Sequence, residues 1–481
     1  MIFSALVCFI FSSAVGQDNT SYYATMSLDD AKKLQKEYPE EIYIIDKKRN
    51  EAAVLLTEEG GHLLHERILT HGPGYVYQST RNEALEALEK SLEKNQRVDV
   101  DFVISENETV EKALHVINAK NIEDHIRELE GYGSRFYMYE SAKQAAKDLK
   151  KKWEAMAAQY NRNDVSVRLF EHELSPMPSV IMTIQGSEIP EDYVIVGGHL
   201  DSTSRNGNDM APGADDNASG IATITEATRA LFEVDFKPKR TIEVMAYAGE
   251  EKGLIGSKEI ASTYKSENRN VIAVGQFDMT NYKGSANDIY FIQDNTDKSL
   301  NNFLISLIES YNTVGEHQIT YGTSRCNYGC SDHFSWDKEG YRTAFPFEAN
   351  IITREHNANI HTKNDTFDLI GTADHAAKFA KLCAEFLIET AKNNARTLSV
   401  DEIVKNDIDI FVQEDILSYK LSGTNAVKNI QLFDINGRLI FQESNASTTG
   451  NISISDFNAG VYVISFQLDN DKQWSKKIVL E

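Results

Sequence analysis

Between about residues 107 and 397, helical patterns alternate with short, nearly continuous apolar segments. Such segments are typical of strands buried on both faces, as in a largely parallel sheet covered by helices. Ligand residues collect at the carboxyl ends of these strands. Acids or a histidine follow three of the segments: His199 follows 193–196, Glu250 and Glu251 follow 241–248, and Asp278 follows 271–277. We therefore expect an α/β domain with a mostly parallel central sheet flanked by helices, and a functional site at one edge of that sheet.

The charge balance of the 481 residues narrows the range of partners. Lysines and arginines number 49 against 73 aspartates and glutamates, a formal net charge of −24. Binding to a phosphate backbone needs clustered positive charge, so we expect no nucleic-acid partner, and anionic membrane surfaces are poor partners. The length corresponds to roughly three domains of about 150 residues.

The first apolar run, residues 1–15, predicts a secretory signal peptide over residues 1–16. It is too short to span a bilayer, and it ends in small residues before Gln17, as at a signal cleavage site. No lysine or arginine precedes the run, and a buried N-terminal strand is the alternative. No other run reaches about 18 apolar residues, so we expect no transmembrane segment and a secreted or cell-surface protein.

Residues 17–110 predict a small α+β domain without a candidate site of its own. Helical patterns and strand-like segments follow one another here, over residues 28–38, 42–45, 53–56 and 81–92. Two interpretations remain open: a cleavable propeptide that covers an active site, or a permanent accessory domain. The position between the signal peptide and the central domain favours the propeptide.

Residues 408–481 predict a small β-sandwich, because helical spacing gives way to short alternating segments. Asn436-Gly437 between two of these segments is a strong hairpin signal, since both residues tolerate positive φ. Residues 430–440, 460–463 and 476–479 resemble the C-terminal sorting domain of the type IX secretion pathway, which implies export by that machinery. The Tyr-Pro-Asn-Pro opening often seen in such domains is absent. A carbohydrate- or protein-binding sandwich is the alternative.

Three cysteines follow the signal peptide. Cys326 and Cys330 stand four residues apart, and in an oxidising compartment two nearby thiols favour a disulfide. A zinc site is the competing interpretation, although structural zinc usually takes four Cys or His ligands and no second cysteine pair exists. Cys383 lies in an apolar helical pattern and is expected to be an inert core thiol.

Two further residues extend the candidate site at the sheet edge. Asp216 lies in the acidic loop 215–220 before a helical pattern, and His361 lies in the segment 360–365. Each acid or histidine alone is weak evidence, because most acids are solvated and most single histidines are structural. Together they point to metal, because imidazole and carboxylate suit zinc in sites that keep positions open for water. Two metals that share one carboxylate would form a hydrolytic centre.

Five segments together resemble the secreted two-zinc aminopeptidases of clan MH, of the vibrio leucyl aminopeptidase type. They are residues 198–202, 211–220, 249–253, 277–282 and 360–362. The resemblance runs in order from His199 to Asp365. It implies a zinc exopeptidase fold for a catalytic domain over residues 111–397, and hydrolysis of peptides that have a free N-terminus.

The resemblance also implies a role for each matching residue. His199 and Asp278 would hold one Zn²⁺, Glu251 and His361 the second, and Asp216 would bridge the two. Asp215 is not expected to be a ligand. Glu250 would be the general base, since adjacent residues at a strand end point apart. Asp201 would hold the far nitrogen of His199, because a carboxylate there fixes the imidazole tautomer.

The segment from Cys326 to Cys330 matches the family's disulfide loop, whose tyrosine is implicated in stabilising the tetrahedral intermediate. Tyr328 is the corresponding candidate here, against the general interpretation that a loop tyrosine packs structurally. Six further residues match positions that line the family's apolar pocket, although core packing is the default for such side chains. They are Met279, Ile292, Phe345, Phe347, Ile351 and Ile360.

The sequence thus predicts a secreted, monomeric metallo-aminopeptidase that removes hydrophobic N-terminal residues. A zinc-activated water would attack the peptide carbonyl, with Glu250 as base and then as acid to the leaving amine. Three alternatives remain open: a single-zinc glutaminyl cyclase acting as an aminoacyltransferase, a two-zinc carboxypeptidase or dipeptidase, and a non-catalytic surface binding protein. All five candidate ligands and Glu250 are present, which favours the two-zinc hydrolase over the glutaminyl cyclase and over the binding protein. Carboxypeptidases and dipeptidases often carry an inserted lid domain, and no such insertion interrupts the catalytic region here.

Overall fold

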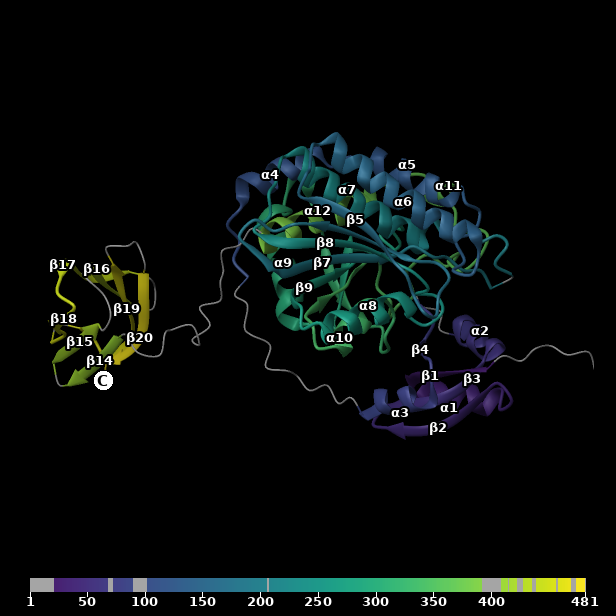
Figure 1. The fold of residues 1–481 in the computed structure, drawn as a ribbon, viewed down its shortest axis with the longest axis horizontal. Coiled ribbons are helices and arrows are strands. Elements are labelled where there is room, and N and C mark those ends of the chain that lie inside the picture. Colours follow the sequence, from purple (N-terminus) through teal and green to yellow (C-terminus); the bar gives the residue numbers. More distant parts are fainter. Residues whose placement is uncertain are drawn as a thin grey trace, which may run out of the picture. The chain divides into compact units, whose positions relative to one another are not determined.

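The computed structural model describes residues 21–67, 72–89, 102–205, 207–391, 408–413, 415–421, 427–434, 438–455, 457–468 and 473–480. The chain divides into two compact units, residues 1–395 and 396–481 (Figure 1). The predicted signal peptide lies outside the described residues. Within the described part of the chain, no helix has the length and apolar character needed to cross a membrane.

The first unit begins with a small α+β domain, as the sequence predicts. Its antiparallel sheet has the order β2-β3-β1-β4. Helix α1 begins after Ser27, whose hydroxyl accepts a hydrogen bond from the backbone N–H of Asp30 at 3.5 Å, a typical N-cap. The elements are β1 (Ser21–Ser27), α1 (Leu28–Glu37), β2 (Ile42–Lys48), β3 (Glu51–Thr57), α2 (Glu58–Arg67), β4 (Tyr75–Gln78) and α3 (Arg81–Glu89).

A six-stranded sheet forms the centre of the predicted catalytic domain, in the order β12-β9-β7-β8-β6-β5. The strands are β5 (Val165–Phe170), β6 (Ser179–Ile184), β7 (Ile189–His199), β8 (Arg240–Tyr247), β9 (Asn270–Gln276) and β12 (Thr343–Ala344). The pairs β12–β9, β9–β7 and β7–β8 are parallel, whereas β8–β6 and β6–β5 are antiparallel. The sheet is therefore mixed, with its parallel part where the sequence places acids and a histidine after the strands.

Helices cover both faces of this sheet; Figure 1 shows α5, α6 and α7 over one face and α8 and α10 over the other. Alternate residues of β7 reach the two layers: Val194 and Val196 lie in the larger core, and Ile195 lies in the smaller one. This explains why the strand is apolar at successive positions from Val194 to Val196. The helices are α4 (Asn107–Val116), α5 (Ala119–Glu130), α6 (Glu140–Gln159), α7 (Gly220–Glu233), α8 (Ile255–Ser266), α9 (Lys298–Tyr311), α10 (His333–Lys338), α11 (Phe367–Ile370) and α12 (Asp374–Ala391).

Two smaller features complete the catalytic domain. A three-stranded sheet of order β11-β10-β13 combines β10 (Ile289–Ile292), β11 (Tyr321–Ser324) and β13 (Pro346–Phe347). Helix α4 buries Val110, Ala113 and Leu114 in the larger core. The domain boundary that the sequence suggests at residue 110 therefore falls inside a helix of this core.

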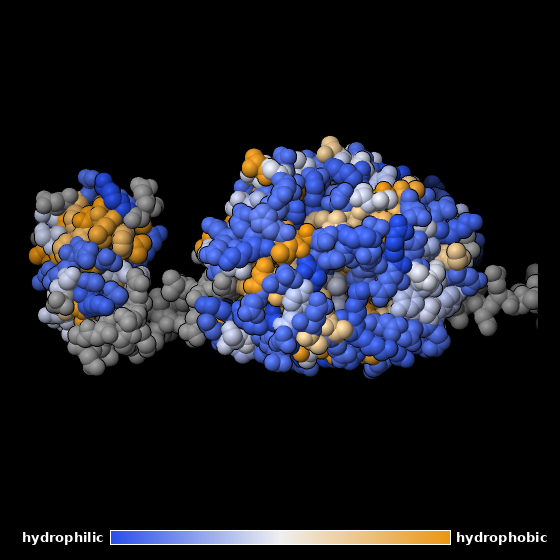
Figure 2. Space-filling model, turned by 90° about the horizontal axis from the view of Figure 1, so that it is seen from above, coloured by the Kyte–Doolittle hydropathy of each residue, from blue (hydrophilic) through white to orange (hydrophobic). Residues whose placement is uncertain are grey.

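The second unit consists of two antiparallel sheets, β14-β15-β18 and β17-β16-β19-β20. Leu417 and Ile452 from one sheet share a core with Leu432 and Phe466 from the other, which makes the unit a sandwich as predicted. The strands are β14 (Ile408–Gln413), β15 (Ile416–Leu421), β16 (Val427–Asp434), β17 (Leu439–Ala446), β18 (Thr449–Ser453), β19 (Gly460–Leu468) and β20 (Gln473–Leu480). Asn436-Gly437 lies outside the described residues, but β16 and β17 on either side of it are antiparallel. Figure 2 shows hydrophobic residues at the surface of this unit.

Candidate active site

Three parallel strands deliver the first candidate residues to one edge of the central sheet. His199 is the last residue of β7 and pairs with Tyr247 at the end of β8. Glu250 and Glu251 follow β8 closely, and Asp278 is the second residue after β9. Because β8 and β9 both run parallel to β7, these strand ends meet.

Loops bring Asp216 and His361 to the same place. Asp216 lies in the irregular turn η1 (Ala214–Ser219) that leads into α7, and His361 precedes α11. Oδ1 of Asp216 lies 3.0 Å from Nε2 of His199, while Oδ2 lies 3.0 Å from Nε2 of His361. The two oxygens of one carboxylate thus face two different histidines, which is the arrangement of a bridging ligand.

Each histidine has one further carboxylate beside it. Nε2 of His199 lies 3.3 Å from Oδ1 of Asp278, and Nε2 of His361 lies 3.2 Å from Oε2 of Glu251. Ligand atoms about 2.0–2.1 Å from a tetrahedral zinc ion lie about 3.3 Å from one another, so these distances suit two ion positions. The potential ligand groups are His199 with Asp216 and Asp278, and Asp216 with Glu251 and His361.

Burial makes the group of acids costly unless cations accompany it. The five residues and Glu250 are each at most 5% exposed. Four carboxylates in this volume face only two imidazoles, and buried charge of one sign is strongly unfavourable without a partner. The donor set of imidazole and carboxylate is the one that zinc prefers, so these residues fit a pair of zinc ions.

Asp201 orients both His199 and the turn after β8. Nδ1–H of His199 donates to the backbone carbonyl of Asp201 at 3.1 Å, whereas the nearest carboxylate oxygen is 3.7 Å away. That carboxylate accepts the backbone N–H groups of Glu250 and Glu251 at 3.1 and 3.2 Å. The sequence predicted that the Asp201 carboxylate contacts the His199 imidazole. In the structure the backbone carbonyl of Asp201 is nearer to Nδ1, and Nε2 of His199 faces the acids.

Asp365 supports the bridging acid, a role that sequence reasoning did not assign. Its carboxylate accepts the backbone N–H groups of Asp215 and Asp216, each at 3.1 Å. Asp215 bonds elsewhere, since its carboxylate accepts from the backbone N–H of Asn281 and from Nδ2 of Asn357. This agrees with leaving Asp215 out of the ligand set. The only sequence signal for Asp365 was its place four residues after His361.

Glu250 lies beside the potential ligands. Its carboxylate, an imidazole nitrogen of His199 and the carboxylate of Glu251 all lie within 4.8 Å of one another. Burial raises the pKa of Glu250 well above its ordinary value; the nearby His199 opposes this, and the negative Glu251, Asp332 and Asp278 add to it. A carboxyl group with a raised pKa holds and releases a proton nearer to neutral pH than an exposed glutamate.

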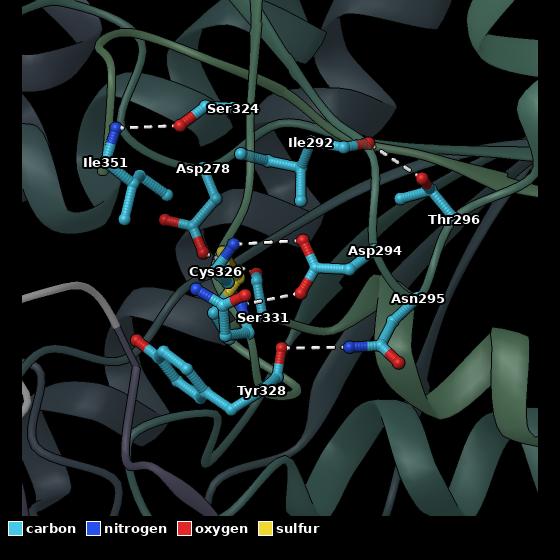
Figure 3. Close-up of a disulfide and its surroundings, with 12 residues drawn as sticks. Asp278, Ile292, Asp294, Asn295, Thr296, Ser324, Cys326, Tyr328, Ser331 and Ile351 are labelled. Atoms are coloured by element: carbon cyan, nitrogen blue, oxygen red, sulfur yellow. Dashed lines mark hydrogen bonds between the residues drawn. A yellow bond between two sulfur atoms is a disulfide. The ribbon is translucent and has the colours of Figure 1, made fainter. Parts of the chain in front are cut away.

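The disulfide between Cys326 and Cys330 is present, which decides between the two interpretations of this pair. Asp294 holds the loop, because its carboxylate accepts the backbone N–H groups of Cys326 and Asn327 at 3.0 and 2.6 Å (Figure 3). Asn295 donates to the carbonyl of Tyr328 at 3.0 Å, and Figure 3 shows the Tyr328 ring extending away from this bond. Cys383 is free and buried, as predicted.

The six predicted pocket residues form one apolar cluster with the disulfide, and Tyr328 packs against it. Met279 follows Asp278 directly, and Ile360 precedes His361, so two members adjoin potential ligands in the chain. This cluster is separate from the two cores of the central sheet. The cluster is buried and lies beside the metal-binding group in the chain.

Comparison with known proteins identifies the family of this chain. Residues 179–387 match the model of peptidase family M28, and residues 413–481 match that of the secretion system C-terminal sorting domain. A probable leucine aminopeptidase of Trichophyton verrucosum is 33% identical over 293 residues, which cover 60% of this chain and 78% of the relative. Leucine aminopeptidase 1 of Arthroderma otae is 34% identical over 299 residues, which cover 59% of this chain and 77% of that relative. The chain belongs to peptidase family M28.

Solved structures of the family resemble this M28 peptidase beyond the catalytic domain. The LapA aminopeptidase of Legionella pneumophila superposes with a TM-score of 0.68 at 29% identity, covering 78% of this chain and 100% of LapA. LapB of the same organism superposes with a TM-score of 0.67 at 26% identity, covering 78% of this chain and 100% of LapB. The protein is an aminopeptidase of the metallopeptidase class, and its type IX sorting domain marks it as secreted or attached to the cell surface.

In this M28 peptidase the N-terminal domain lies directly over the site. A methyl group added at Gly72 would be 2.5 Å from the carbonyl oxygen of Cys330 and 3.3 Å from Oε1 of Glu250. The backbone N–H of Tyr77 in β4 donates to the carbonyl of Gly253 at 3.1 Å. The segment before β4 therefore approaches Glu250 and the disulfide loop closely.

Ion pairs and hydrogen bonds hold this domain in place. Lys252, which follows Glu251 in the chain, pairs with Glu58, and Lys338 pairs with Glu51 at 2.7 Å. Lys258 donates to the carbonyl of Tyr77 at 2.9 Å. A cavity of about 750 Å³ remains between the two domains, lined by residues of β1, α1 and β4 and by Tyr328 and Gly329 of the disulfide loop.

Proposed function

We propose that this protein is a two-zinc aminopeptidase that removes hydrophobic N-terminal residues from peptides. His199 and Asp278 would hold one ion, Glu251 and His361 the other, and Asp216 would bridge them. The observation that carries this is the bridging geometry of Asp216, whose two oxygens lie 3.0 Å from Nε2 of two different histidines. The charge of the buried acids supports it independently, because two divalent cations would balance them.

The chain's own residues perform the proton transfers. A zinc ion, when bound, lowers the pKa of a water molecule toward neutrality. Glu250 accepts the proton of the attacking water at a carboxylate oxygen and then delivers it to the nitrogen of the leaving amine. The hydroxyl of Tyr328 donates to the oxyanion that develops from the peptide carbonyl.

The groups at and beside the potential zinc ligands determine which substrates bind. A zinc ion, when bound, would accept the lone pair of a free, uncharged α-amine, so an acylated N-terminus would bind poorly. The apolar cluster that includes Met279, Phe347 and Ile351 would accept a hydrophobic first side chain. One methylene more or less changes binding only modestly in such a pocket, so leucine, methionine and phenylalanine should all be accepted.

The N-terminal domain acts as an inhibitory propeptide in this proposal. The potential zinc ligands and Glu250 are buried in the uncleaved chain. In this proposal a peptide reaches them once the covering domain moves or leaves. The approach of Gly72 to Glu250 supports this interpretation over a permanent accessory domain. The C-terminal sandwich would be the signal read by the type IX secretion machinery.

The test combines metal content with peptidase assays on protein cleaved at a protease site introduced between residues 89 and 102. We expect two zinc ions at these five ligands, hydrolysis of leucyl-p-nitroanilide well above the glutamyl compound, and no hydrolysis of N-acetyl-leucyl-p-nitroanilide. Glu250→Gln should keep its zinc and lose about 10²–10⁴-fold in kcat. Glu267→Gln on the surface is the matched control.

The same assays separate the alternatives. A single zinc with pyroglutamate formation would replace the proposal by a glutaminyl cyclase. Cleavage from the free carboxyl end would indicate a carboxypeptidase. Two bound ions without hydrolysis of any free-amine substrate would exclude the aminopeptidase mechanism.

A further inference from the structure

A second group of histidines and carboxylates lies outside the active site. Glu111 and His115 stand one turn apart on α4, so their side chains lie on the same face of the helix. His317 ends the short turn η2 (Gly315–His317), which follows α9. One ligand atom from each of these three residues lies within 4.8 Å of the other two.

Glu316 supplies a fourth potential ligand. Its Oε1 lies 3.1 Å from Nδ1 of His115 and 3.6 Å from Nε2 of His317. Atoms that ligate one tetrahedral zinc ion lie about 3.3 Å apart, between these two values. The two imidazole rings are edge to face, with centroids 4.9 Å apart. Two imidazoles and two carboxylates therefore converge on one small volume.

His317 is the least exposed member, and its ring nitrogens make no hydrogen bond to the described residues. The side chain is only 12% exposed. Buried polar atoms are normally satisfied, so imidazole nitrogens without a hydrogen-bond partner beside carboxylates are available to bind a cation.

The nearest lysine is bonded to the turn that carries His317. Nζ of Lys381 on α12 donates to the backbone carbonyl of Glu316 at 3.1 Å, so this cation is engaged with the backbone of the turn.

We propose that Glu111, His115, Glu316 and His317 bind a structural zinc ion. Two imidazoles with carboxylates form a donor set that zinc prefers, and calcium or magnesium would favour oxygen atoms alone. The ion would cross-link α4, the first helix of the catalytic domain after the N-terminal domain, to the turn after α9. Because these four side chains come together only in the folded chain, the ion would stabilise the fold by binding to the folded state alone.

The test measures zinc per chain and local protection on the full-length protein, without reference to activity. After equilibrium dialysis against buffered zinc, His317→Ala should hold one ion fewer per chain than the wild type. Zinc should slow hydrogen exchange over residues 107–116 and 312–320 in the wild type and leave it unchanged in the variant. Because none of the four residues belongs to the active site, peptidase activity should be the same in both proteins.

Two further variants keep the test decisive. Glu111→Gln changes an exposed side chain and should also remove one ion, even if His317→Ala folds poorly. His62→Ala, which alters an exposed histidine of α2, should keep the full complement. Equal zinc content in wild type, His317→Ala and Glu111→Gln would overturn the proposal.

Discussion

The hydroxyl of Ser331 donates to Oδ2 of Asp278 at 2.6 Å, while Oδ1 of the same carboxylate lies 3.3 Å from Nε2 of His199. Nε2 of Gln276 donates in turn to Oγ of Ser331 at 3.0 Å. This chain of hydrogen bonds fixes which oxygen of Asp278 faces the potential zinc position. A partner of this kind orients a ligand that would otherwise rotate.

Ser331→Ala should therefore weaken zinc binding by about 10–100-fold while leaving kcat at saturating zinc within a few-fold of wild type. Competition with a chelator of known affinity measures the change. Ser310→Ala on the exposed face of α9 is the control. Unchanged zinc affinity in Ser331→Ala would mean that packing alone holds the Asp278 carboxylate.

The close approach of Gly72 to the active site gives a test of inhibition by the N-terminal domain. Its φ of 77° disfavours a side chain, and a methyl group there would overlap the carbonyl of Cys330. Gly72→Ala should displace the segment and raise peptidase activity of the uncleaved chain several-fold. Gly133→Ala is the matched control, because Gly133 has a φ of 70° and nothing within 4 Å of an added methyl group. Equal activity of both uncleaved variants would argue for a permanent accessory domain.

Replacing Tyr328 tests the source of the oxyanion donor. Tyr328→Phe keeps the packing of the ring against the disulfide cluster and removes the hydroxyl, so kcat should fall about 10²–10³-fold with KM and zinc content little changed. Steady-state kinetics on cleaved protein measures kcat and KM separately. Tyr321→Phe removes a hydroxyl that donates to Glu309 at the surface and should have no effect. A change confined to KM would assign Tyr328 to substrate binding.

His375 should make the folded state sensitive to acid. Burial lowers its pKa to about 4, with the positive Lys283 and Lys378 adding to this, although Nε2–H donates to the carbonyl of Asp288 at 2.8 Å. The unfolded chain takes up its proton near pH 6.5, before the folded protein does. Stability from this group is therefore complete above pH 6.5 and is lost as the pH falls toward 4, by about 3 kcal/mol.

His375→Gln should remove this part of the pH dependence. Denaturant unfolding with a chelator present at every pH isolates the effect from loss of zinc. The difference in unfolding free energy between pH 7 and pH 4.5 should shrink in His375→Gln and persist in His62→Gln. An equal difference in both variants would place the acid sensitivity in other groups.

Much of the active site could be predicted from the sequence because the end of a buried strand can be recognised from a few neighbouring residues. An apolar run followed at once by His199, Glu250 or Asp278 specifies both the strand and the residue at its carboxyl end. Parallel pairing then brings those ends together. The same local logic predicted the C-terminal sandwich and the small α+β domain, whose alternation and turn residues are short-range signals.

The sequence by itself thus determined the elements, the residue types at the sheet edge and the spacing that allows the Cys326–Cys330 disulfide. Only the tertiary structure decided that Asp216 turns its two oxygens to different histidines, that Ser331 orients Asp278, that Gly72 lies against Glu250, and that His115 meets His317. Each of these pairs joins residues separated by long stretches of chain. Such contacts depend on how helices and strands pack, and packing is set by the whole core rather than by any local pattern.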